Sequence, residues 1–121
     1  MRRNKLQLYI HLVWSTHQRL NSINKFNLPL IFKIAKDKCL EKKCRLIQIG
    51  GTANHIHLLI ELNPSTMISA LVKAIKGFSS YQINRDNHIN QNLKWQKGYG
   101  AFSVSPQLLT NVKKYIEAHD Y

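Results

Sequence analysis

Apolar and polar residues alternate along three stretches of the chain, and this period-two pattern predicts β-strands. The stretches are residues 6–14, 45–49 and 54–62. In the first stretch, the apolar face carries Leu8, Ile10, Leu12 and Trp14, and the opposite face carries Tyr9, His11 and Val13. In the last stretch, a continuous apolar face suited to a core is formed by Ile56, Leu58, Ile60 and Leu62.

Apolar residues at helical spacing predict three helices. The first begins near Pro29, and its inward stripe is Leu30, Ile31, Ile34, Ala35 and Lys38. The second follows Ser65 or Thr66, either of which can cap it. Its stripe is Ile68, Leu71, Val72, Ile75, Phe78 and Gln82. The third begins at Ser105-Pro106, a capping hydroxyl followed by proline, and runs to the end of the sequence.

Glycines divide the remaining segments. Gly50-Gly51 predicts the turn after the second strand, and two further short strands, 93–95 and 101–104, are expected on either side of residues 98–100. The predicted order is strand, helix, strand, strand, helix, strand, strand, helix. Because neighbouring strands are joined by tight turns, we expect an α+β fold, an antiparallel sheet with helices packed on it in a ferredoxin-like arrangement. Residues 1–121 are expected to form a single domain.

Charge narrows the class of partner. The 121 residues include 18 Lys and Arg against 6 Asp and Glu, a net charge of +12 that favours a polyanion such as nucleic acid. No apolar run approaches the ~20 residues that span a bilayer, and the start of the chain shows no signal-peptide pattern. Cys39 and Cys44 lack CxxC spacing, so we expect reduced thiols in a cytoplasmic protein.

His55 and His57 are the first candidates for chemistry. On a strand they share the face opposite the apolar one, about 6–7 Å apart. They can converge on one metal ion if a third ligand comes from elsewhere, or they can be two solvent-facing histidines. Glu61 shares their face but is about 13 Å from His57, so we expect it to be structural.

Tyr115 and His119 are the second candidates. They are four residues apart in the last predicted helix and are therefore neighbours on one face. Tyr115 continues a stripe from Leu108 and Val112, and this spacing favours a core tyrosine. His119 would lie beside the phenol and can supply the missing third ligand.

Three blocks of residues together resemble the single-tyrosine transposases of the HUH nuclease superfamily, which include REP-associated tyrosine transposases and small insertion-sequence transposases. The blocks are His55-Ile56-His57 with its apolar continuation, residues 94–105, and residues 112–117. The segment 73–80 is similar as well, and the resemblance extends over about residues 8–119. An isolated HxH pair is a weak signal, whereas three blocks in this order and spacing are specific.

The resemblance implies a metal-dependent transposase that nicks and rejoins hairpin-containing single-stranded DNA. Tyr115 is implied as the nucleophile, which leaves a 5′-phosphotyrosine and a free 3′-hydroxyl. His55, His57 and His119 are implied as ligands of Mg²⁺ or Mn²⁺. A homodimer is expected, with a monomer as the alternative.

The sequence departs from the family pattern at three places. His119 stands where glutamine is usual, and Asn54 stands where an acidic residue commonly precedes the histidine pair. The sequence ends at Tyr121, where relatives usually continue, which predicts a short member or one without a tail that helps dimerisation or cleavage.

Candidate DNA-binding residues combine cations with aromatic rings that can stack on unpaired bases. They are Arg19, Lys73, Lys76, Lys94, Trp95, Lys97 and Tyr99, and Phe102 is a further ring. For Trp95 and Phe102, packing in the core is the competing interpretation. Two alternatives to a transposase stay open. One is a non-catalytic binder of structured single-stranded nucleic acid, and the other is a metal-dependent nuclease that activates water.

Overall fold

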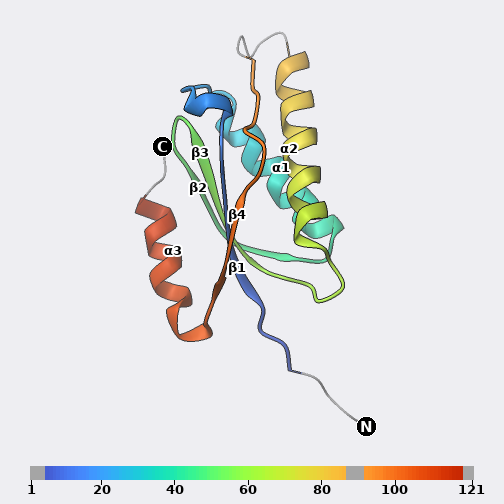
Figure 1. The fold of residues 1–121 in the computed structure, drawn as a ribbon, viewed down its shortest axis with the longest axis vertical. Coiled ribbons are helices and arrows are strands. Elements are labelled where there is room, and N and C mark those ends of the chain that lie inside the picture. The colour runs from blue at the N-terminus through green and yellow to red at the C-terminus, as the bar shows by residue number, and fades with distance from the viewer. Residues whose placement is uncertain (1–4, 87–91, 119–121) are drawn as a thin grey trace.

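The computed structural model describes residues 5–86 and 92–118, which form a sheet with two helices on one face and one on the other (Figure 1). The elements of these described residues are, in chain order, β1 (Tyr9–Ser15), the short 3₁₀ helix η1 (His17–Arg19), α1 (Leu28–Glu41), β2 (Arg45–Gly51), β3 (His55–Glu61), α2 (Ile68–Arg85), β4 (Gly100–Val104), the 3₁₀ turn η2 (Pro106–Leu108) and α3 (Leu109–Ala118).

The four strands found in the described residues lie in the order β2-β3-β1-β4, and each neighbouring pair is antiparallel. β1 is therefore central, paired with β3 on one side and β4 on the other. α1 and α2 cover one face of the sheet, and α3 lies on the opposite face (Figure 1). This order of a β-α-β-β-α-β chain is ferredoxin-like, so the predicted α+β class and antiparallel sheet are confirmed.

The core lies between the sheet and the pair α1 and α2. The alternation predicted for β1 and β3 is confirmed, since one face of these strands is buried there: Leu12, Trp14, Ile56, Leu58 and Ile60. β1 begins at Tyr9 rather than at residue 6, and Leu8 is exposed rather than inward. Glu61 pairs with Arg45 across β2 and β3 at 2.9 Å, which confirms its structural role.

The segment 93–95 is not a strand, contrary to prediction. Within the described residues it makes one isolated bridge, between Trp95 and Thr16. The Trp95 side chain packs into the core. Trp95 is buried edge-on against Trp14, with ring centroids 6.1 Å apart, and its indole N–H donates to Ser79 Oγ at 2.9 Å. Two backbone hydrogen bonds flank the bridge, from His17 N to Lys94 O at 2.8 Å and from Gln96 N to Ser15 O at 2.9 Å, so these bonds and the side-chain contacts hold the segment without a longer strand ladder.

Gly50 and Gly51 lie inside β2, so the predicted turn at these residues is wrong. The chain turns after Gly51 instead. Gly50 is a point of close approach, because a Cβ there would lie 2.5 Å from the carbonyl oxygen of Ile116 and 2.9 Å from its Cγ2. The absence of a side chain lets α3 pack directly on the strand.

The predicted caps of α2 are wrong. The N-cap position is Met67, and neither Ser65 nor Thr66 caps the helix. The Thr66 hydroxyl instead donates to the carbonyl oxygen of Lys42 at 2.7 Å. This bond joins the start of α2 to the end of α1.

The buried stripe of α2 also differs at its C-terminal half. Ser79 and Ile83 are buried there, whereas Phe78 is exposed. Ser79 turns inward because its hydroxyl accepts the Trp95 indole N–H. Phe78 lies beneath the Lys38 ammonium, which is 4.3 Å from the ring centroid.

Lys76 of α2 is hydrogen-bonded to residues 96–98, the segment before β4. Its Nζ donates to the carbonyl oxygens of Gln96 at 2.6 Å and Gly98 at 3.0 Å. Burial lowers the pKa of Lys76 from its usual value. The ammonium predicted to contact DNA is thus engaged with the protein's own backbone.

Cys39 and Cys44 are both buried free thiols. Burial, together with the neighbouring Cys44, raises the pKa of Cys39 to about 12, so this thiol stays protonated and unreactive. Among the helices of the described residues, we find none with the length and apolar character needed to cross a membrane.

Gly50→Val tests the contact between β2 and α3. We expect it to lower the free energy of unfolding by about 1–3 kcal/mol, because the added atoms collide with helix backbone rather than with a flexible side chain. Chemical denaturation monitored by circular dichroism measures this loss. Gly77→Ala is the control, since a Cβ there meets nothing within 4 Å and alanine favours the helix by up to ~1 kcal/mol. Unchanged stability of Gly50→Val would contradict the close packing.

Lys76→Met tests the fastening of the 96–98 segment. Loss of two charge-assisted hydrogen bonds should raise the amide exchange rate of this segment by roughly tenfold or more. Hydrogen–deuterium exchange with mass spectrometry gives the measurement. Lys73→Met, a change at an exposed lysine of the same helix, should leave the exchange rate as it is. Equal protection in both variants would show that these two bonds do not hold the segment.

Candidate active site

A cleft of about 480 Å³ lies at one end of the sheet. Antiparallel pairing creates it, because the C-terminal end of β1 meets the N-terminal ends of β3 and β4: Val13 pairs with both His57 and Gly100. The cleft is lined by Val13, Trp14, Ser15, Arg19, His55, His57, Gln96, Lys97, Gly98, Tyr99, Gly100 and Tyr115. Residues from β1, η1, β3, the segment that leads into β4, and α3 therefore meet at this end of the sheet.

His55 is held through its Nδ1 atom. This nitrogen is 2.7 Å from Thr52 Oγ1 and 2.9 Å from Asn54 Oδ1. Because an amide oxygen only accepts, the contact with Asn54 makes Nδ1 the donor and leaves the lone pair of the neutral ring on Nε2. Asn54 thus orients the ring with its amide oxygen, at the position where the family pattern commonly has an acidic residue.

His57 is almost fully buried, with 6% of its surface exposed, so it is not a solvent-facing histidine. Its ring centroid lies 4.7 Å from that of His55, with the two planes nearly perpendicular at 82°. The predicted pairing of these histidines on one face is confirmed by the register of β1 and β3.

His11 is a member of the site that the sequence reasoning placed on this face but did not single out. Its Nε2 is 2.9 Å from His57 Nδ1, and the two rings stack with centroids 5.1 Å apart. Burial lowers the pKa of His11, which favours the neutral ring. Alternation already put His11 opposite the apolar face, but only the strand register shows that it lies diagonally beside His57.

Tyr115 is half exposed and is not a core residue, so the interpretation favoured by its spacing is wrong. The buried residue of α3 is Ile116, and Leu108 lies in the preceding 3₁₀ turn and is exposed. The inward face is therefore rotated from the predicted stripe. The Tyr115 ring lies 5.8 Å from the His57 ring and 6.3 Å from the His11 ring.

A divalent metal would take its ligands from the histidine pair. The orientation of His55 by Thr52 and Asn54 fits such a role, since metal-binding histidines ordinarily donate their other ring nitrogen to an oxygen. His119, the predicted third ligand, lies outside the described residues. Within the described part of the chain, no group of three or more His, Cys, Asp or Glu side chains can hold a metal.

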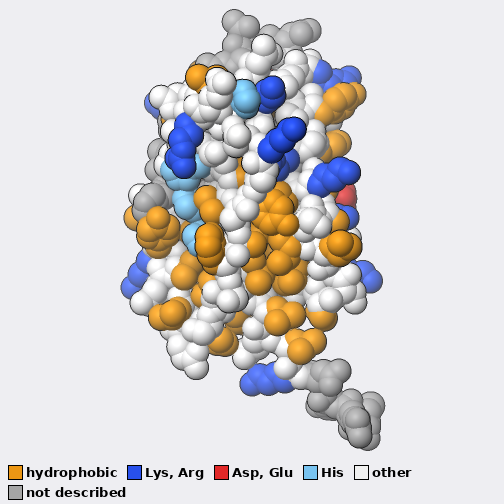
Figure 2. Space-filling model, in the orientation of Figure 1, with side chains coloured by type: hydrophobic (Ala, Val, Ile, Leu, Met, Phe, Trp, Pro, Cys, Tyr) orange, Lys and Arg blue, Asp and Glu red, His pale blue; other side chains and the backbone are white. Residues whose placement is uncertain are grey.

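Two of the predicted DNA-binding cations, Arg19 and Lys97, line the cleft. Arg19 lies in a turn with a strained backbone, because Gln18 and Arg19 both have positive φ angles, 54° and 53°. The backbone N–H of Gln18 donates to Gln96 Oε1 at 3.1 Å, and this hydrogen bond joins the turn to the segment before β4. Figure 2 shows histidine side chains on the left of the view, with Lys and Arg side chains around and above them.

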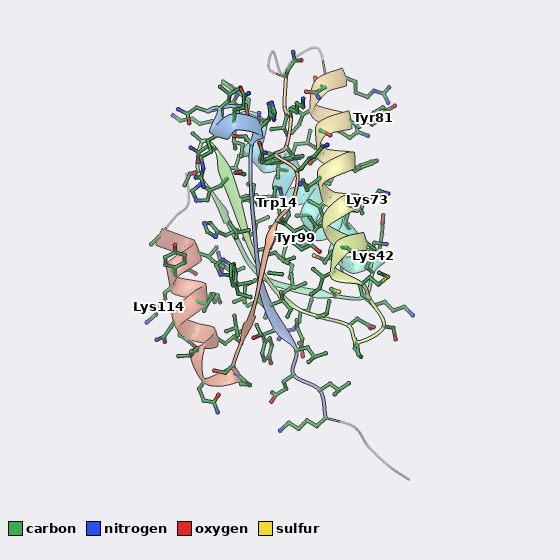
Figure 3. All side chains as sticks on the ribbon, viewed as in Figure 1. Trp14, Lys42, Lys73, Tyr81, Tyr99 and Lys114 are labelled. Atoms are coloured by element: carbon green, nitrogen blue, oxygen red, sulfur yellow. The ribbon has the colours of Figure 1, made fainter. Side chains whose placement is uncertain are left out.

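Of the other predicted DNA-binding residues, Tyr99 lines the cleft as well, whereas Lys73, Lys76, Lys94 and Trp95 are not part of its lining. Lys73 is on α2, along a neighbouring groove that includes Lys97 and Tyr99, and Lys94 lines a second groove beside α2. Tyr99, labelled in Figure 3, is exposed where it lines the cleft. Trp95 is in the core, as the competing interpretation held. Phe102 is 57% exposed on β4 and is not a core residue.

Comparisons with known proteins bear on the family and the fold of the chain. The family model described as "Transposase IS200 like" matches residues 4–119. A crystal structure of a candidate transposase from Deinococcus radiodurans R1 is similar with a TM-score of 0.74 and 23% identity, covering 99% of this chain and 98% of that one.

A REP-associated tyrosine transposase bound to a REP hairpin is similar with a TM-score of 0.68 and 12% identity, covering 96% of this chain and 68% of that one. No curated protein matches significantly. These structural likenesses show the fold, and the family match extends over nearly the whole sequence. The chain belongs to the IS200-like transposase family.

Proposed function

We propose that this protein nicks and rejoins hairpin-containing single-stranded DNA, with Tyr115 as the nucleophile. The observation that carries the proposal is the position of the Tyr115 ring. It is half exposed, lines the cleft and lies 5.8 Å from the ring of His57. An accessible tyrosine beside histidines, which can act as bases or hold a metal, suits covalent phosphoryl transfer, because a hydroxyl nucleophile must be activated by a neighbouring group.

In the proposed reaction, the phenol oxygen of Tyr115 attacks a backbone phosphorus as its proton leaves. The bond from phosphorus to the 3′-oxygen breaks, and that oxygen takes up a proton. The products are a 5′-phosphotyrosine and a free 3′-hydroxyl. Attack of a second 3′-hydroxyl on the phosphotyrosine reverses these changes and restores the phenol, so the phosphodiester is rejoined without an external energy source.

His55 and His57 would hold a divalent cation, Mg²⁺ or Mn²⁺, with His119 proposed as the third ligand. Imidazole ligands favour Mn²⁺ over Mg²⁺. Such an ion supplies stabilisation of the negative charge that develops on the phosphate oxygens. Thr52 and Asn54 support this role by fixing the ring of His55.

Arg19 and Lys97 are proposed to bind the phosphates that flank the scissile bond. Both are exposed cations that line the cleft, and the strained turn at Arg19 is typical of a functional segment. Tyr99 offers an exposed ring on which an unpaired base can stack. The hairpin bound to the REP-associated relative supports the choice of a hairpin substrate for this chain.

A homodimer is part of the proposal. β4 is at the edge of the sheet, and Phe102 on this strand is exposed, so a second copy can cover it. Within the single chain, α3 packs on β2, and the Tyr115 ring lies 5.8 Å from the ring of His57 of the same chain. Light scattering after size exclusion measures the oligomeric state.

Tyr115→Phe tests the nucleophile. Incubation with Mn²⁺ and a single-stranded hairpin oligonucleotide should give a covalent protein–DNA adduct on a denaturing gel. The variant should lower adduct formation by at least about a thousandfold, because the attacking oxygen is absent, while hairpin affinity stays close to that of the wild type.

Tyr81→Phe is the matched control, since Tyr81 is an exposed tyrosine on α2, across the sheet from α3. It should form the adduct at the wild-type rate. Cleavage that persists in Tyr115→Phe without an adduct would indicate a nuclease that activates water. Tight hairpin binding with no adduct from the wild type would indicate a non-catalytic binder.

Arg19→Ala and Lys97→Ala test the phosphate contacts. Each variant should weaken hairpin binding and reduce the salt dependence of log K by about 0.7, the value for one phosphate contact on a single strand. Fluorescence anisotropy at several salt concentrations measures both quantities. Lys33→Ala, at an exposed lysine of α1, should leave the slope unchanged. A slope equal to that of the wild type in both cleft variants would remove these residues from the DNA interface.

A further inference from the structure

We infer that His11 is a positioning residue, which holds His57 in the tautomer that binds metal through Nε2. This inference rests on the proposed function, because it concerns the histidine pair of the same site. His11 acts through His57 and does not itself touch the reacting phosphate.

The hydrogen bond between the two histidines has only two forms. His11 Nε2 and His57 Nδ1 are 2.9 Å apart, so one nitrogen carries the proton and the other accepts it. When His57 Nδ1 donates, its neutral ring keeps the lone pair on Nε2. When His11 Nε2 donates, the lone pair of His57 is used at Nδ1, and Nε2 carries the hydrogen. Only the first form leaves His57 able to bind metal through Nε2.

His55 shows which form the site requires. Its Nδ1 donates to Asn54 Oδ1, so its metal-binding lone pair is on Nε2. The rings of His55 and His57 are 4.7 Å apart on the same face of β3. For both to bind one ion in the same way, His57 must also donate from Nδ1, and the group placed to accept that proton is His11. His11 Nε2 would thus accept the proton of His57 Nδ1, as the amide oxygen of Asn54 accepts the proton of His55 Nδ1.

The surroundings of His11 restrict its rotation. Its ring stacks on His57 at an interplanar angle of 27°, and it is flanked by Phe102 and Tyr115, each with a ring centroid 6.3 Å away. These neighbours come from β3, β4 and α3. The ring is therefore fixed by three elements, as a positioning residue needs to be.

His11 is not well placed as a third ligand. Within the described residues, the three histidines do not form a group able to hold a metal. His11 Nε2 is also already used in the hydrogen bond with His57 Nδ1, at 2.9 Å. A role through the hydrogen bond accounts for both observations.

Nuclear magnetic resonance of the metal-free protein tests the tautomer directly. Long-range ¹H–¹⁵N correlation should show His57 with its hydrogen on Nδ1 in the wild type. In His11→Phe, which keeps an aromatic ring but has no acceptor, the hydrogen should move to Nε2. A wild-type His57 with its hydrogen on Nε2 would overturn the inference, and this measurement needs no variant to fold.

Titration with Mn²⁺ alone, without DNA, tests the consequence. His11→Phe should raise the dissociation constant by about 10–100-fold, the usual effect of losing a group that orients a metal ligand. His11→Gln, whose side-chain oxygen can accept the same proton, should recover most of the affinity. His17→Phe, a histidine of η1 outside the cleft lining, is the control and should bind Mn²⁺ as the wild type does.

His57→Ala separates this inference from the proposed function. If His57→Ala loses Mn²⁺ binding while folded His11→Phe keeps it, the positioning role is wrong and the metal site stands. If His57→Ala keeps full Mn²⁺ affinity, the proposed metal site itself is wrong. If His11→Gln folds but binds as weakly as His11→Phe, the hydrogen bond is not what supports His57, and the inference fails.

Discussion

The contact between Gly50 of β2 and Ile116 of α3 is the constraint on which the site depends. A side chain at Gly50 would lie 2.5 Å from helix backbone, so the helix can rest on the strand only because that side chain is absent. Ile116 is the buried residue of α3, and Tyr115 is its neighbour. The depth at which Ile116 packs therefore sets how closely the phenol approaches His57.

The strand register and a small set of polar contacts complete the arrangement. Antiparallel pairing brings three strand ends to one end of the sheet, so the histidines of β3, the turn at Arg19 and the segment before β4 line one cleft. Residues that are not part of the cleft lining then contact the lining residues or their segments. Asn54 orients His55, His11 contacts His57, and Lys76 fastens the segment before β4 to α2. Rigid support of this kind preorganises a site for chemistry.

Positive charge is spread over the molecule rather than confined to the cleft. Lys73 on α2 and Lys114 on α3 lie on opposite sides of the sheet (Figure 3). A net charge of +12 distributed in this way attracts nucleic acid in general but does not select a position along it. Under the proposed function, selection would come from the short-range geometry of the cleft, which Arg19, Lys97, Tyr115 and the histidine pair line together.

The α+β class, the two faces of β1 and β3, the pairing of the two histidines and the family could all be predicted from the sequence. These follow from local periodicity and from motifs whose spacing is visible along the chain. Only the packed structure shows that α3 packs against Gly50, that Trp95 is in the core, that Tyr115 is exposed, that His11 contacts His57 and that Lys76 bonds to the segment before β4. The reason is physical: periodicity shows which residues share a face, whereas the strand register and the helix that covers that face depend on contacts between distant segments.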